Sequence, residues 1–219
     1  MTPRDVTGGV DELERLLASR LAGELPGGSA QARLAPRPRE GWQPDRVPAD
    51  SRVGAGLLLI YPSGGRPHLL LTVRDGGMPL HAGQVSLPGG GVRRGEAIVE
   101  AALREAEEET GVRPQEVRIL GELSPLHIPV SGFVLHPVVG VARVRPELRP
   151  QPGEVERILE VPLAELSSPE RLHVETRAFR GRDYRVPWID VDGEKLWGAT
   201  AMIVAELLSL TDNPPPDWS

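Results

Sequence analysis

The chain has 219 residues, of which 39% are hydrophobic, and this length and composition allow one large domain with a substantial core. It contains no cysteine, which excludes disulfides, zinc–thiolate sites and thiol catalysis, and its formal net charge of −6 argues against a general nucleic-acid coat. The N-terminus lacks a basic start followed by an apolar run, and the apolar stretches fall far below the roughly 18 residues of a membrane span, so we expect a soluble, cytoplasmic protein without membrane contact.

Five apolar side chains near the N-terminus recur at helical spacing: Val10, Leu13, Leu16, Leu17 and Leu21. This stripe predicts an amphipathic helix over residues 10–21, which we interpret as a packing arm. Residues 26–50 are rich in proline, glycine and arginine without periodicity, and they predict an extended connector. Two apolar runs follow at 53–61 and 68–73, and the turn-forming residues 62–67 between them predict a β-hairpin.

Residues 74–88 are polar and punctuated by glycine, so we expect a loop that runs into a turn at Gly89-Gly90-Gly91. A helix is expected next. Its apolar stripe comprises Val99, Leu103 and Ala106, which can pack on a sheet. Gly111 is suited to end this helix in the left-handed conformation.

Four carboxylates crowd into five residues of this helix: Glu105, Glu107, Glu108 and Glu109. At about 100° per residue, Glu105, Glu108 and Glu109 share one face, whereas Glu107 points the opposite way. Like charges this close repel one another, so the shared face favours a cation. Oxygen ligands in this arrangement suit Mg²⁺ or Mn²⁺. The alternative is a solvated acidic face, which is the commoner meaning of a charge run taken alone.

The rest of the chain shows shorter patterns. The elements expected from them are strands at 117–123 and 134–144 joined by 126–132, a loop at 146–153, a strand with a helical turn at 154–166, a hairpin of 188–191 with 195–197, and a buried helix at 199–210, apolar nearly all round. Residues 173–184 are too irregular to assign. This mixed order fits an α/β sandwich better than a parallel βαβ array.

The spacing around the acidic helix is specific. Gly90, five residues, Glu96, seven residues and then the run from Arg104 to Val112 satisfy the pattern G-x5-E-x7-R-E-U-x-E-E-x-G-U, where U is apolar. The chain therefore resembles the Nudix hydrolases, which cleave nucleoside diphosphates linked to another group. The resemblance implies a metal-dependent pyrophosphohydrolase on an α/β/α sandwich with a mixed sheet, here with an N-terminal helical extension.

On this resemblance the chain divides into three parts. Residues 1–50 form the N-terminal helix and connector, 51–211 form the Nudix hydrolase domain, and 212–219 form a tail. A homodimer is the family-level expectation for assembly.

The loop before the helix resembles the signature of the coenzyme A pyrophosphatase branch, LLTxR-S-x3-R-x3-G-x3-FPGG. Matching residues are Leu70, Leu71, Thr72, Arg74, Gly83, Pro88, Gly89 and Gly90. Asp75, Pro79 and Leu87 depart from it, and Pro79 replaces an arginine that can grip phosphate. The resemblance implies cleavage of coenzyme A to 3′,5′-ADP and 4′-phosphopantetheine. The alternatives are an enzyme acting on ADP-ribose or NADH and a non-catalytic nucleotide-binding module, against which the intact carboxylate cluster argues.

The resemblance also implies roles for individual residues. The metal ligands are Glu105, Glu108 and Glu109, and the supports of the site are Gly90, Glu96, Arg104 and Gly111. The general base of the family comes from the helix or from a later loop. Glu154 and Glu156 both follow a Pro-Gly turn that allows them to reach the metal, and Glu154 is the favoured candidate. The expected substrate contacts are Arg74, His81, Gly83 and Gly89, whereas His127, His136 and His173 are interpreted as structural.

Overall fold

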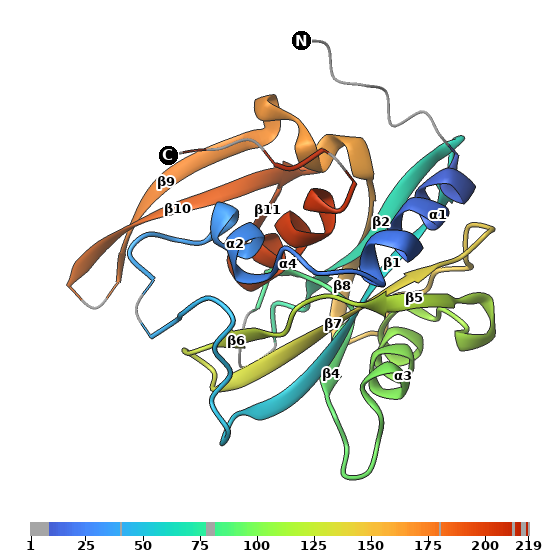
Figure 1. Ribbon diagram of the computed structural model, residues 1–219, viewed down its shortest axis with the longest axis horizontal. Coiled ribbons are helices and arrows are strands. Elements are labelled where there is room, and N and C mark those ends of the chain that lie inside the picture. The colour runs from blue at the N-terminus through green and yellow to red at the C-terminus, as the bar shows by residue number, and fades with distance from the viewer. Residues whose placement is uncertain are drawn as a thin grey trace.

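The computed structural model describes residues 9–39, 41–77, 82–179, 181–211, 213–215 and 218. It shows a central mixed sheet with helices on both faces, which confirms the predicted α/β sandwich (Figure 1). No helix among these residues has the length and apolar character needed to span a membrane.

The sheet is built around the predicted hairpin. Strands β1 (Arg52–Ser63) and β2 (Arg66–Arg74) pair antiparallel, and Gly64 and Gly65 form the turn with positive φ angles. β1 pairs in parallel with β7 (Phe133–Val141), whereas all other pairs in the sheet are antiparallel. The other strands are β3 (Val85–Ser86), β4 (Gly89–Gly91), β5 (Arg118–Glu122), β6 (Leu126–Ile128) and β8 (Val155–Pro162).

Alternate residues of β1 enter two separate apolar clusters. Leu58 and Ile60 pack with helices α1 (Val10–Leu21) and α4 (Gly198–Ser209), whereas Leu57 and Leu59 pack beneath α3 (Ile98–Thr110). Figure 1 shows α3 across the sheet from α1, α2 and α4. Because both faces are covered, β1 is a nearly continuous apolar run rather than an alternating one.

The helix predicted at residues 10–21 is confirmed, but the prediction of an entirely extended connector is wrong. The connector, residues 26–50, begins with α2 (Gly27–Gln31) and a 3-10 turn at Ala32–Leu34. Glu206 of α4 is fully buried and accepts hydrogen bonds from Gly27 N–H at 3.2 Å, Gln31 Nε2 at 2.8 Å and Ser124 N–H at 3.2 Å. A tertiary partner therefore holds a helix that glycine-rich sequence alone disfavours.

The turn predicted at Gly89–Gly91 is instead strand β4, paired with β1. A Cβ atom on Gly89 would lie 2.4 Å from the carbonyl oxygen of Ala55, so only glycine allows the two main chains to approach this closely.

A second sheet of three strands packs against α4. It contains β9 (Leu172–Phe179), β10 (Arg182–Val191) and β11 (Glu194–Trp197), of which the β10–β11 hairpin was predicted. Residues 173–179 and 182–184, which the sequence left unassigned, belong to the paired strands β9 and β10. The other short elements are 3-10 helices at Pro114–Glu116, Leu163–Ser167 and Pro169–Arg171.

Candidate active site

Helix α3 presents the acidic cluster, and both of its ends are fixed. The carboxylate of Glu100 accepts the N–H of Ala97 at 3.0 Å at the start of the helix. Gly111 ends it in the left-handed conformation, with φ of 74°, and donates its N–H to the carbonyl of Glu107 at 2.9 Å. Glu109 is buried, whereas Glu107 and Glu108 are exposed, so the three carboxylates expected to share a face differ in burial.

Strand β4 forms the floor beneath two of the carboxylates. The N–H of Gly89 donates to Glu109 Oε2 at 3.1 Å. A Cβ atom on Gly90 would lie 2.5 Å from the carboxyl carbon of Glu105. Glycine at position 90 therefore leaves room for the carboxylate of Glu105 to lie directly against the main chain.

Arg104 of α3 joins the helix to the preceding loop, residues 92–97, through Glu96. Its Nε lies 2.6 Å from Glu96 Oε1, its Nη2 lies 3.0 Å from Glu96 Oε2, and its Nη2 also donates to the carbonyl of Gly91 at 3.2 Å. The N–H of Arg93 donates to Glu96 Oε2 at 2.8 Å. The hydrogen bonds from Arg104, followed by the one from Arg93, lower the pKa of Glu96 to about 2, so this carboxylate stays ionised.

Two of the candidate ligands face arginines. Glu105 Oε1 lies 2.5 Å from Arg104 Nη1, and Glu108 lies 3.4 Å from the same atom and 3.3 Å from Arg93 Nη2. Within the described part of the chain, no three histidine or acidic side chains converge as a metal site in this arrangement. To bind a metal ion, Glu105 and Glu108 would have to release their ion pairs with Arg104 and Arg93.

Glu109 lacks such a strong partner. It is 4% exposed, accepts one N–H from Gly89, and lies 3.8 Å from Arg74 Nη1. Burial raises the pKa of Glu109 to about 7, with further increases from the charges of Glu105 and Glu154, while Gly89 and Arg74 oppose the shift. A carboxylate in this environment is stabilised by any cation that enters the site.

Glu154 is positioned by the loop that covers the end of α3. Gln151 N–H donates to the carbonyl of Glu109 at 2.9 Å, and Asp75 N–H donates to the carbonyl of Glu154 at 2.9 Å. A register shift in the β2–β8 pairing occurs beside Arg74. The main chain of Glu154 is therefore anchored between the helix and the signature loop, and its exposed carboxylate is close enough to raise the pKa of Glu109.

The signature loop folds back on itself. Gly83, with φ of 68°, donates its N–H to the carbonyl of Arg74 at 3.0 Å, and the carboxylate of Asp75 accepts the N–H of Gly77 at 2.8 Å. Arg74 and Gly89 reach the carboxylates, whereas the contacts of Gly83 close the loop. His81 and Pro79 lie outside the described residues.

Residues 50–180 match the model of the NUDIX domain. The chain belongs to the Nudix family. It is similar to a Photorhabdus laumondii protein named "Uncharacterized Nudix hydrolase NudL", with 38% identity over 165 residues, 75% of this chain and 87% of that protein. A Pectobacterium atrosepticum protein of the same name is 40% identical over 153 residues, 68% of this chain and 78% of its own length. The crystal structure of RenU, a Nudix hydrolase from M. smegmatis, aligns with a TM-score of 0.46 and 24% identity, covering 52% of this chain and 73% of that one.

Nudix hydrolases act on pyrophosphate bonds and generally use divalent metals such as Mg²⁺ or Mn²⁺. The residues of this site fit such an ion in two respects. Their donors are carboxylate oxygens, which hard divalent cations prefer. Glu109 is also a buried carboxylate with a single hydrogen bond, and Glu105 lies in a recess that a side chain at Gly90 would fill.

Sequence reasoning missed one buried charge. Glu206 lies in a helix interpreted as apolar nearly all round, and the only signal was a single carboxylate within that apolar run. Its partners come from segments far away in the sequence.

Proposed function

We propose that this Nudix protein hydrolyses the diphosphate of coenzyme A to 3′,5′-ADP and 4′-phosphopantetheine. The observation that carries the proposal is the position of Arg74. This arginine belongs to the coenzyme A signature, and its guanidinium lies 3.8 Å from Glu109 of the Nudix helix. The signature loop and the acidic helix therefore act on one substrate, with Arg74 facing its phosphates.

The residues around α3 then divide into metal ligands and structural supports. Glu105, Glu108 and Glu109 hold Mg²⁺ or Mn²⁺, which neutralises phosphate charge and lowers the pKa of water when bound. Arg104 and Glu96 hold the loop before α3 against the helix. Gly90 leaves room for the carboxylate of Glu105, and Gly111 ends the helix.

Glu154 serves as the general base. It accepts the proton of a water whose oxygen bonds to one phosphorus, while the bridging P–O bond breaks and the second phosphate leaves. Its anchored main chain and exposed carboxylate favour this role, since a general base must reach the attacking water without being buried by its neighbours. Glu154→Gln should lower kcat about 100-fold, and about equally for every substrate that is cleaved.

The test is a substrate panel. Purified protein is incubated with coenzyme A, ADP-ribose and NADH, each with Mg²⁺ or Mn²⁺, and the products are identified by mass. Predominant formation of 3′,5′-ADP and 4′-phosphopantetheine supports the proposal.

Faster cleavage of ADP-ribose or NADH would refute the choice of coenzyme A and favour a Nudix enzyme with an altered pocket. Pro79 is the specific observation behind that second candidate, because it replaces the signature arginine. Recovery of every ligand uncleaved after long incubation with Mn²⁺ would instead indicate a binding module.

A further inference from the structure

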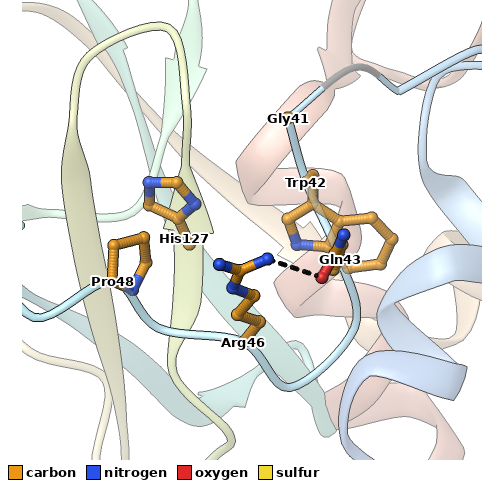
Figure 2. Close-up of a pocket in the computed structure, with 6 residues that line it drawn as sticks. All are labelled: Gly41, Trp42, Gln43, Arg46, Pro48 and His127. Carbon is orange, nitrogen blue, oxygen red and sulfur yellow. Dashed lines mark hydrogen bonds between the residues drawn. The ribbon is translucent and has the colours of Figure 1, made fainter.

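A pocket of about 280 Å³ lies between the connector, residues 26–50, and strand β6 (Figure 2). Its lining residues are Gly41, Trp42, Gln43, Arg46, Pro48 and His127. The volume is near the lower end of the roughly 300–1,000 Å³ typical of small-molecule sites. All of these residues except His127 precede residue 50, where the match to the NUDIX domain begins. The connector of this chain therefore adds a cavity to the family's domain.

The connector is held in place on both sides of the pocket. Asp45, with φ of 59°, accepts the N–H of Gly28 at 2.7 Å, which ties the connector to α2. Gly41, with φ of 72°, lies against Pro129 in the β6–β7 turn. Trp42 packs against the larger apolar cluster. The walls are thus formed before any ligand arrives, which lowers the entropic cost of binding.

The pocket combines the aromatic rings of Trp42 and His127 with the positive charge of Arg46. Figure 2 shows the Arg46 side chain between His127 and Pro48 on one side and Trp42 on the other. Arg46 donates to Gln43 Oε1 at 3.0 Å, and no carboxylate is among the described lining residues. Arg39 lies over the Trp42 ring at 5.2 Å, and its buried Nε has no hydrogen-bond partner in the described structure. A planar ring that carries an anionic group fits these features.

The pocket lies at the same end of the sheet as the acidic site. His127 of β6 pairs with Val134 of β7, Val134 pairs with Val53 of β1, and the neighbouring Gly54 pairs with Gly91 of β4. Three strand spacings of this kind span about 14 Å. An extended adenosine diphosphate has a comparable length, so a ligand whose diphosphate lies beside β4 can extend toward His127.

We propose that this pocket binds the 3′-phosphoadenosine end of the substrate, with the base against Trp42 and the 3′-phosphate on Arg46. The inference rests on the proposed function and extends it, because it assigns the specificity for a ribose phosphomonoester to the connector. A substrate without that phosphate loses the contact with Arg46.

The test compares Arg46→Ala with Arg143→Ala, a matched change at an exposed arginine beyond β7. Loss of a charge-assisted hydrogen bond should raise KM for coenzyme A about tenfold in Arg46→Ala, with kcat within about twofold. KM for dephospho-coenzyme A, which lacks the 3′-phosphate, should change little. Arg143→Ala should match the wild type for both substrates. Equal KM values for coenzyme A in the wild type and Arg46→Ala would overturn the proposal.

Binding of 3′,5′-ADP, measured by calorimetry without turnover, separates the two proposals. If the panel shows no cleavage of coenzyme A, the proposed function fails, and this titration still tests the pocket. The pocket is supported if Arg46→Ala weakens 3′,5′-ADP binding about tenfold and Trp42→Phe, which keeps a ring, weakens it less. Affinity that is unchanged in Arg46→Ala would overturn the assignment even if coenzyme A is cleaved.

Discussion

Two buried glutamates of this Nudix protein differ in the number of hydrogen-bond donors that face their carboxylates. Glu206, between α4 and α2, accepts three hydrogen bonds, from Gly27, Gln31 and Ser124. Glu109, on α3, accepts one, from Gly89, and faces other carboxylates. A buried carboxylate with a full set of donors clamps segments together, whereas one with too few donors attracts a cation. We therefore infer that the first serves stability, and we propose that the second serves chemistry.

The largest expected effect is on the clamp. Glu206→Ala leaves the N–H groups of Gly27 and Ser124 and the amide of Gln31 without their acceptor, so we expect a loss of about 4 kcal/mol in the free energy of unfolding. Urea unfolding in the presence of EDTA measures it. Glu206→Gln keeps one acceptor and should lose less. A loss below about 1 kcal/mol in Glu206→Ala would show that these bonds are not needed.

The next effect is on catalysis. Glu109→Gln keeps the volume and the acceptor for Gly89 but removes the charge, so we expect kcat to fall at least about 100-fold at saturating Mg²⁺. Glu107→Gln, an exposed residue on the same helix, is the matched control and should keep wild-type kcat. Unchanged turnover in Glu109→Gln, with circular dichroism showing an intact fold, would remove Glu109 from the proposed site.

A smaller effect concerns the stability of the metal-free protein. Because folding raises the pKa of Glu109 to about 7, the folded state binds the proton more tightly than the unfolded state does. The stabilisation is fully present below the unfolded pKa of about 4.5 and is lost as the pH rises to about 7, a change of roughly 3 kcal/mol. Urea unfolding in EDTA across this range measures the slope. Glu109→Gln should remove that part of the slope, and a slope identical to the wild type would contradict the assignment.

The smallest effect is the release of protons on metal binding. Near pH 7 about half of the Glu109 side chains are protonated in the metal-free protein, so Mn²⁺ should displace a fraction of a proton. Calorimetry in buffers of different ionisation enthalpy gives this fraction. It should approach zero at pH 8.5, and a release independent of pH would mean that another group supplies the proton.

Local sequence predicted the features that depend on near neighbours. Helix α3 and its end at Gly111 follow from helical spacing and a glycine within one segment. The β1–β2 hairpin follows from two apolar runs with a glycine turn between them.

Features that depend on distant partners were not predicted. Strand β4 was expected to be a turn, because its pairing depends on the approach of β1, some 35 residues earlier in the chain. Helix α2 depends on Glu206, and the β9–β10 hairpin depends on pairing between two polar strands whose alternation is weak. The pocket beside Trp42 likewise depends on the fold, since it brings His127 of β6 to a connector some 80 residues earlier in the chain.

The parallel pairing of β1 with β7 also has a consequence for how the chain folds. The two strands occupy the middle of the sheet, yet about 80 residues separate the paired positions. Contacts this distant in sequence form slowly, because a long loop must close before they contribute. During synthesis, the central strand waits for its neighbour until most of the domain has emerged from the ribosome. We therefore expect α3 to pack on the sheet late in folding, after the β1–β2 hairpin has formed.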